Sequence, residues 1–583
     1  MLIPKTFIFI AVSYLSATTS ANSLEHILHS GNGNYIIQLN QTTCIKHFVP
    51  EFINGAFNIF SQSLGGSEHL EKTNNRIVRR DTQDDQVHVF DAYDIGSTFK
   101  GISVKFEQLD IVKTLLASFN HDIIKIIPDQ DIQFDLPTSK RTALKKRYYI
   151  RASKKNPQRE SREGNFDYDH YEHDANCPYN PDNQMASASA ASFQESSSNL
   201  IQKAATTKKK TTTKKTTTKK KTTKKTTKKV STVKKAATTK KATTKKKATT
   251  KKTTTKKKTT TKKKTTTTKK KTTTKKATTT TAKNSVSAAK YTQQASPQWN
   301  LARISEHKRA LTKPYIYDSN AGSGTYVYVI DDGLNVDHKD FGGRAKWGWS
   351  AYKGASTLGE GHGTHVAGII GSKTYGVAKK ANLIAVQVLN DEGTGSISSL
   401  LAGLQWVTTH AKAHKGKAII NMSLGMEVSG TSSSALKAFN DAISAVVDSG
   451  VPLIAAAGNW GDDSCGILPA GNPDVYTVAA SDKNDKFAYY SSWGKCVSII
   501  APGTDIKSTF IDSNTSTEVL SGTSMASPHV AGVAALLISK LADPTPANLY
   551  KELTKIATKD IITDVVKNTP NVLLFNGQKL TTN

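Results

Sequence analysis

Four polar residues in this 583-residue chain stand in short motifs whose composition is that of a serine acyl-transfer site. Asp331 lies in VYVIDDG, His362 in EGHGTHVAG, Asn459 in AAAGN and Ser524 in SGTSMASPHVAG. A serine hydroxyl attacks an acyl carbon when an imidazole accepts its proton and a carboxylate orients that imidazole. The Asn459 amide and the backbone N–H of Ser524, at the start of an apolar helix, are suited to hold the oxyanion. Each motif alone is weak evidence, but the four together predict nucleophilic acyl transfer.

The runs that carry these residues predict the fold that positions them. TYVYVIDDG, NLIAVQVL, KAIINMSL, VPLIAAAGN, VYTVAA and VSIIAPG are short and continuously apolar, and stretches with helical spacing separate them. Strands of this kind alternating with helices indicate a parallel sheet covered on both faces, so residues 299–577 are expected to form an α/β domain. In such sheets the chemistry lies beyond the carboxyl ends of the strands, where the four polar residues fall.

A smaller folded module is expected at residues 34–137. NYIIQL and FKGISVKF have the composition of strands, DIVKTLLASF has helical spacing, and residues 121–134 are typical of a closing strand. This pattern predicts a compact α+β domain.

The charge of the chain is concentrated in one segment. The formal net charge is +33, yet residues 203–283 contain 34 lysines and no Arg, Asp or Glu. The other residues hold 46 Lys and Arg against 47 Asp and Glu, a net charge of −1. A nucleic-acid-binding fold that is basic throughout is therefore excluded, and nucleic acid is not expected as a partner.

Residues 138–298 read as a disordered linker that contains the Lys/Thr tract 203–283. The tract is self-repelling and has no aromatic side chain, so it cannot bury enough apolar surface to fold. Two interpretations stay open beside nucleic-acid binding: a spacer with threonines suited to O-glycosylation, and a ligand for an acidic cell-wall polymer.

The first 21 residues, MLIPKTFIFIAVSYLSATTSA, have the layout of a cleaved secretory signal: a basic residue, a short apolar run and small residues at the end. The run is too short to span a bilayer, so no membrane span is expected. The protein is predicted to enter the secretory pathway and to reach the exterior, a cell or spore wall, or a vacuole. Its 4 cysteines fit an oxidising compartment, and Asn40 and Asn514 lie in glycosylation sequons.

On the motifs that contain Asp331, His362 and Ser524, the large domain resembles the subtilisin-like serine proteases (subtilases), specifically the proteinase K branch and its fungal members of the cerevisin type. The resemblance implies a serine endopeptidase in which Asp331 orients the imidazole, His362 is general base and then acid, and Ser524 is the nucleophile. It implies an oxyanion hole made by Asn459 and the Ser524 backbone N–H.

The resemblance also implies residues outside the triad. Two segments are expected to hold an extended polypeptide substrate as an added strand: Gly393, Thr394 and Gly395 in DEGTGSIS, and Ser423, Leu424 and Gly425 in MSLGM. A disulfide is expected between Cys465 and Cys496. Residues 34–137 are expected to be a ferredoxin-like subtilase propeptide, an intramolecular inhibitor of a self-processed, monomeric zymogen.

Two departures from the family pattern stand out. The residue after the catalytic Asp is usually Ser or Thr, whereas here it is Asp332. Because neighbours on a strand point to opposite faces, Asp331 is kept as the triad member, and the extra charge is expected to raise the imidazole pKa. A calcium site formed by the carbonyls of Pro473 and Val475 would lack its usual carboxylate, because Ser498 stands there. No cofactor and no metal ligand is therefore predicted, with calcium only weakly supported.

Two functions of different class follow. The first is a secreted or vacuolar serine endopeptidase made as a self-processed zymogen. The second is a non-catalytic wall or spore-coat component that uses the same domain as a scaffold and the basic tract as a polyanion anchor. Every catalytic side chain is present, which favours the enzyme.

Overall fold

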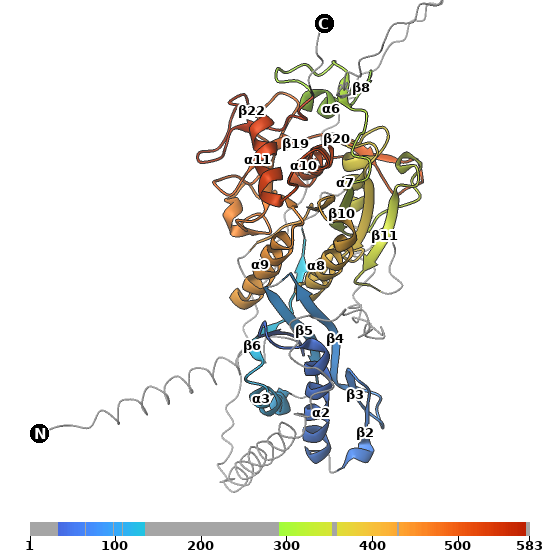
Figure 1. The fold of residues 1–583 in the computed structure, drawn as a ribbon, viewed down its shortest axis with the longest axis vertical. Helices are drawn as coiled ribbons and strands as arrows, with labels where there is room; N and C mark the ends of the chain where they lie inside the picture. The colour runs from blue at the N-terminus through green and yellow to red at the C-terminus, as the bar shows by residue number, and fades with distance from the viewer. Residues whose placement is uncertain are drawn as a thin grey trace, which may run out of the picture. The chain divides into compact units, whose positions relative to one another are not determined.

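The computed structural model describes residues 33–63, 66–96, 98–107, 109–134, 291–352, 358–427 and 431–578. The expected signal segment 1–21, the Lys/Thr tract 203–283 and most of the linker 138–298 lie outside these residues. The described chain contains two sheets that matter for the site, one from each side of the linker (Figure 1).

The N-terminal sheet has the strand order β2-β3-β4-β5-β1-β6. Its elements are β1 (Asn34–Leu39), α2 (Ile45–Ser63), β2 (Leu70–Lys72), β3 (Arg76–Arg79), β4 (Asp85–Ile95), β5 (Phe99–Phe106), α3 (Leu109–Ser118) and β6 (Ile123–Pro128). The central β1-α2-β4-β5-α3-β6 path is a split βαβ arrangement. The sequence reading identified β1, β5 and α3 but missed α2, whose buried aromatic residues recur at helical spacing around an internal proline.

The closing strand expected at residues 121–134 is in fact two strands. β6 pairs with β1, and β7 (Asp131–Gln133) leaves that sheet to pair antiparallel with β13 (Thr394–Ser396) of the large domain. Only β6 therefore closes the small sheet, and the last residues of the module form part of a contact with the large domain.

The large domain is built on a nine-stranded sheet with the order β11-β12-β10-β14-β16-β18-β19-β23-β22. These strands are β11 (Ala345–Ser350), β12 (Asn382–Gln387), β10 (Tyr326–Asp331), β14 (Ala418–Met422), β16 (Leu453–Ala456), β18 (Tyr476–Ser481), β19 (Ile499–Pro502), β23 (Val572–Leu573) and β22 (Thr558–Lys559). All neighbouring pairs are parallel except the edge pair of β22 and β23. The predicted α/β class is confirmed.

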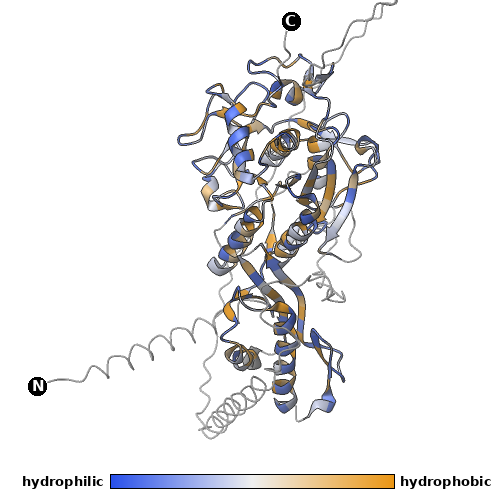
Figure 2. Cartoon of the chain, in the orientation of Figure 1, coloured by the Kyte–Doolittle hydropathy of each residue, from blue (hydrophilic) through white to orange (hydrophobic). Residues whose placement is uncertain are grey.

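Helices cover both faces of this sheet (Figure 1). In β10, Val327 and Val329 belong to the apolar cluster that includes α7 (His362–Gly371) and α10 (Thr523–Ile538). Tyr328 and Ile330 belong to the cluster that includes α8 (Ile397–Ala411) and α9 (Ser433–Asp448). The strand is buried on both sides, which explains its continuous apolarity. By contrast, α11 (Pro546–Ile556) buries few residues and is largely hydrophilic in Figure 2.

The large domain begins before the expected boundary at Trp299. β8 (Tyr291–Gln294) pairs antiparallel with β9 (Tyr315–Asp318), and α6 (Trp299–Ile304) follows β8. The placement of residues 291–298 in the linker was therefore wrong. The sequence YTQQ does not show the apolar pattern typical of a strand, because two of its four side chains are exposed in this two-stranded pair.

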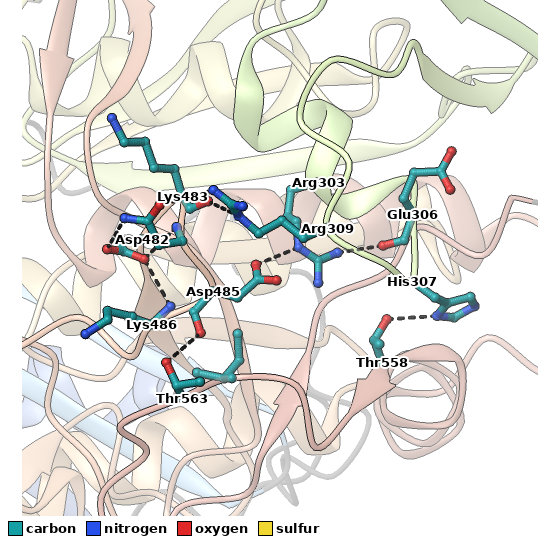
Figure 3. Close-up of polar contacts among 12 residues, drawn as sticks. Arg303, Glu306, His307, Arg309, Asp482, Lys483, Asp485, Lys486, Thr558 and Thr563 are labelled. Carbon is teal, nitrogen blue, oxygen red and sulfur yellow. Dashed lines mark hydrogen bonds and ion pairs between the residues drawn. The ribbon is translucent and has the colours of Figure 1, made fainter.

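Helix α6 and the segment after it are tied to distant parts of the domain by polar contacts (Figure 3). The buried Arg303 guanidinium donates to Asp485 Oδ1 at 2.7 Å, and Arg309 donates to the Lys483 carbonyl at 2.8 Å. His307 Nδ1 lies 2.8 Å from Thr558 Oγ1. These contacts anchor the segment that follows the linker, so it belongs to the folded domain.

Candidate active site

The four predicted catalytic residues lie at the carboxyl ends of sheet strands or at the starts of helices next to them. Asp331 is the last residue of β10 and His362 is the first residue of α7. Asn459 follows β16, and Ser524 is the second residue of α10. The strands β10, β14 and β16 are parallel neighbours, so their ends share one edge of the sheet.

The structure joins the predicted carboxylate and imidazole directly. His362 Nδ1 lies 2.7 Å from Asp331 Oδ1, and both side chains are almost completely buried. Burial alone would lower the pKa of His362, but the charge and hydrogen bond of Asp331 outweigh it, so this pKa is raised. Within the described residues His362 Nε2 is buried and has no hydrogen-bond partner. The imidazole is therefore oriented on one side and open to accept a proton on the other.

A glycine lets α7 approach β10 closely enough for this contact. A Cβ atom on Gly363 would lie 2.2 Å from the Gly333 carbonyl oxygen and 3.0 Å from Asp331 Cβ. Both distances are too short for a side chain. The glycine directly after His362 thus has a steric reason.

Ser524 is held by Ser423 rather than by His362. Its Oγ donates to the Ser423 carbonyl at 3.0 Å, and its own carbonyl accepts from Ser423 Oγ at 2.9 Å. No hydrogen bond between Ser524 and His362 occurs among the described residues. The structure therefore brings Asp331 and His362 together, whereas the hydroxyl must leave the Ser423 carbonyl before it can transfer a proton to the imidazole.

Pro528 explains why the Ser524 carbonyl has no hydrogen-bond donor within its own helix and accepts from Ser423 instead. Because α10 begins at Thr523, Pro528 lies inside the helix, beyond its first turn. Proline has no N–H, and the residue four positions earlier loses its helical hydrogen bond. That residue is Ser524, and the Ser423 hydroxyl supplies the missing donor.

The Asn459 amide is oriented by the start of α10. Its Oδ1 accepts from the backbone N–H of Thr523 at 2.8 Å and from Thr523 Oγ1 at 2.9 Å. With the oxygen engaged, the Nδ2 hydrogens remain for an oxyanion. Thr523 is a functional residue that the sequence reading missed, although it directly precedes Ser524.

The two predicted substrate segments differ in their surroundings. Thr394 and Gly395 belong to β13 and pair with Gln133 and Ile132 of β7, while the Gly393 carbonyl accepts from the Phe134 N–H at 3.0 Å. The first segment thus already holds an extended strand.

The second segment, Ser423 to Gly425, follows β14, and its Ser423 and Leu424 side chains are buried. The next residues form β15 (Met426–Glu427), which pairs with β17 (Ile467–Leu468). No strand pairing between this segment and β7 occurs among the described residues.

The predicted disulfide is present: Cys465 and Cys496 are bonded, with their Cα atoms 5.3 Å apart. The Ser498 hydroxyl, at the expected calcium position, accepts from the Thr477 N–H at 3.2 Å. Among the described residues no group of three or more His, Cys, Asp or Glu side chains is arranged to hold a metal ion.

A buried Asp-His pair, a serine at a helix start and an oriented amide, all at one edge of a parallel sheet, define a serine hydrolase. Residues 322–576 match the family model described as "Subtilase family". Alkaline protease 1 of Aspergillus flavus is 45% identical over 288 residues, covering 49% of this chain and 69% of that protein. A subtilisin-like serine protease of Rhodotorula mucilaginosa, Rho m 2.0101, is 44% identical over 317 residues, covering 51% of this chain and 90% of that protein.

Cerevisin of Saccharomyces cerevisiae is 43% identical over 314 residues, covering 50% of this chain and 48% of that protein. A solved structure, of a cold adapted subtilisin-like serine proteinase, is 37% identical and covers 48% of this chain and 99% of its own, with a TM-score of 0.45. The chain belongs to the subtilase family and is a serine endopeptidase that acts on polypeptide substrates. The scaffold alternative is not favoured, because these curated relatives carry protease names.

Proposed function

We propose that Asp331, His362 and Ser524 carry out peptide-bond hydrolysis through an acyl-enzyme. The observation that carries this assignment is the buried contact of 2.7 Å between His362 Nδ1 and Asp331 Oδ1, with His362 Nε2 left without a partner. An imidazole held in this way has its Nδ1 proton on the carboxylate side and its Nε2 lone pair available.

The reaction follows from these positions. The Ser524 hydroxyl turns from the Ser423 carbonyl to His362, Nε2 accepts its proton, and Oγ attacks the scissile carbonyl carbon. The resulting oxyanion accepts hydrogen bonds from Asn459 Nδ2 and from the Ser524 backbone N–H, which lies in the first turn of α10 and has no helical partner. His362 then protonates the leaving amine, and water repeats the sequence to release the acyl group. These steps need no cofactor.

Active-site labelling tests the assignment. The purified, self-processed protein is treated with a fluorophosphonate probe, which modifies only an activated serine. We expect one labelled peptide containing Ser524, and no label in Ser524→Ala or in heat-denatured protein. Labelling at another serine, or equal labelling of the denatured chain, would remove Ser524 from the mechanism.

We further propose that residues 34–137 inhibit the large domain until they are cut away. β7 already occupies the strand position at β13 that a substrate is expected to take, and Phe134 is buried beside it. Behind this strand, the Asp129 carboxylate accepts from the Ser398 N–H at 3.0 Å and from Ser398 Oγ at 2.6 Å, in the first turn of α8. In this proposal the module blocks the strand position at β13 and is held there by a carboxylate at a helix N-terminus.

Removing the Asp129 carboxylate should weaken this inhibition. Hydrogen bonds to a charged group contribute about 1.5–3 kcal/mol, so Asp129→Ala is expected to raise the inhibition constant about 10- to 100-fold. The measurement is the recovery of activity when the processed complex is diluted. Asp81→Ala, which removes an exposed carboxylate of the same module, should leave the recovery unchanged. Equal recovery in both variants would contradict a role for Asp129.

For partners and location we propose entry into the secretory pathway as a monomer, with the Lys/Thr tract 203–283 contacting an acidic wall polymer. The terminal compartment is the cell exterior, a wall or a vacuole. No helix in the described part of the chain combines the length and apolarity that crossing a membrane requires. Asn514 is exposed, and its side-chain oxygen Oδ1 accepts a hydrogen bond from Asn335, so its Nδ2 is left for a glycan. By contrast, Asn40 Nδ2 donates to the His121 carbonyl.

A further inference from the structure

The second carboxylate of the DDG motif, Asp332, is fully buried and accepts hydrogen bonds from the backbone around His362. Its Oδ2 accepts from the N–H of Glu360 at 2.9 Å and of His362 at 3.2 Å, and its Oδ1 accepts from the N–H of Gly363 at 2.8 Å. N–H groups at a helix start have no partner inside the helix. Three donors at or just before the start of α7 therefore converge on one side chain, that of the residue directly after β10.

The helix has no cap of its own. Its N-cap residue is Gly361, which has a φ of 97° and no side chain to accept a hydrogen bond. The usual capping residues, Ser, Thr, Asp and Asn, serve this purpose from within the helix sequence. Here the equivalent acceptor belongs to the residue directly after β10, so capping the helix also fixes its distance from the end of that strand.

The surrounding chain is shaped to admit the carboxylate. A Cβ on Gly359 would lie 2.5 Å from Asp332 Cγ, and one on Gly363 would lie 3.1 Å from Asp332 Oδ1. Gln387 of β12 fixes Asp332 from the other side, since its Nε2 donates to the Asp332 carbonyl at 2.9 Å. Glycine is therefore required on both sides of the carboxylate, and the neighbouring strand holds its backbone.

We propose that Asp332 is a positioning residue for the catalytic histidine: its carboxylate clamps the first turn of α7 to the end of β10 and thereby sets the His362 ring against Asp331. The proposal rests on the proposed role of His362. Asp332 does not touch the imidazole nitrogens; it acts through the backbone of residues 360–363. A single hydroxyl in its place would offer one oxygen, whereas the carboxylate offers two, one toward each side of the turn.

The charge of Asp332 adds a pH dependence to this clamp. The charged groups that act on Asp332 are Asp331, the last residue of β10, and His362 on α7, whereas Glu360 contacts it through its backbone N–H. The nearby His365 stays neutral, because burial lowers its pKa to about 3. Burial and the Asp331 charge raise the pKa of Asp332 to about 8. Above this pH both oxygens accept freely from the backbone, and the added negative charge raises the pKa of His362. The clamp is therefore complete only on the alkaline side.

The experiment compares Asp332→Asn with wild type in the self-processed protein, with kcat and KM measured from pH 5 to pH 11. Asparagine keeps the shape but places an NH2 group against backbone N–H groups. We expect kcat to fall about 10- to 100-fold, the cost of a small misplacement of a catalytic group, with KM changed less than about threefold. The rise of activity around pH 8 should disappear, because the asparagine side chain does not titrate whereas the pKa of Asp332 lies at about 8.

Asp337→Asn is the matched control, because Asp337 is an exposed carboxylate on the same segment after β10, and its kcat and pH profile should equal those of wild type. Active sites are counted by fluorophosphonate labelling, so that partial unfolding is not read as lower kcat. If Asp332→Asn yields no labelled enzyme, Asp332→Thr is measured for the same two quantities, and a lost pH 8 step supports the proposal.

A pH profile of Asp332→Asn, or of Asp332→Thr where that variant is used, that superimposes on wild type would overturn the proposal. The proposal would also be overturned if the variant lost kcat/KM only through a higher KM, with kcat unchanged. In either case, labelling of Ser524 in the wild-type protein would leave the triad assignment intact. If the wild-type protein is not labelled at Ser524, the triad assignment itself is wrong.

Discussion

Replacing Ser524 by alanine is expected to lower kcat by about six orders of magnitude, the loss known for this substitution in subtilisin, a member of the same family, and borrowed from it here. The alanine has no hydroxyl to deliver to His362, while the oxyanion donors of Asn459 and of the helix start remain. The residual activity should therefore still exceed that of water alone. Because self-processing uses the same chemistry, the variant should also accumulate as the unprocessed precursor on a gel.

The kinetic part of this prediction needs an enzyme freed of its propeptide. Ser524→Ala precursor can be processed in trans by affinity-tagged wild type, which is then removed, and any remainder is inactivated with the fluorophosphonate probe. Ser521→Ala is the matched control: it removes an exposed hydroxyl just before α10 that accepts from the Asp505 N–H. It should mature normally and keep kcat within about twofold, as surface substitutions usually do. Normal maturation of Ser524→Ala would instead place the nucleophile elsewhere.

Much of the catalytic edge was predictable because its signals are local. Asp331 ends a strand, His362 and Ser524 lie at the starts of helices, and Gly361 and Gly363 on either side of His362 leave room that a side chain would not. In a parallel sheet such positions meet at one edge whatever the loop lengths between them. The alternation rule chose Asp331 over Asp332, and in the structure Asp331 contacts the imidazole whereas Asp332 accepts from the backbone N–H of His362.

What the sequence did not reveal depends on contacts between distant segments. Nothing local marks β7 as separate from β6, because the preference of Ile132 for a strand is satisfied equally by its own sheet or by β13. The hydrogen bond from Ser423 to the Ser524 carbonyl joins residues 101 positions apart. The three backbone donors to Asp332 come from a turn about thirty residues further along the chain, with separations of 28, 30 and 31. Periodicity and composition contain no information on these pairings.

Replacing Asp331 by asparagine is expected to lower kcat by about four orders of magnitude, the size of effect known for this change in other Ser-His-Asp proteases and borrowed here. The amide cannot stabilise the imidazolium and offers an N–H toward Nδ1, which favours the wrong tautomer of His362. Since the Asp331 carboxylate is the main group that raises the pKa of His362, the lower-pH limb of kcat/KM should also move to lower pH. Both effects are measured by steady-state assays across pH, with the concentration of active sites determined by fluorophosphonate labelling.

Because Asp332 is next to Asp331, this prediction also tests which of the two carboxylates orients His362. A second carboxylate one residue away would rescue the Asp331→Asn variant if it were free to turn to the imidazole. Its oxygens, however, accept from the N–H groups of Glu360, His362 and Gly363, and turning would leave these buried donors unsatisfied. Asp331→Asn should therefore lose at least one hundredfold more kcat than Asp332→Asn. If Asp332→Asn is instead the more damaging change, the two carboxylates have exchanged roles, and Asp332 is the residue that orients the histidine.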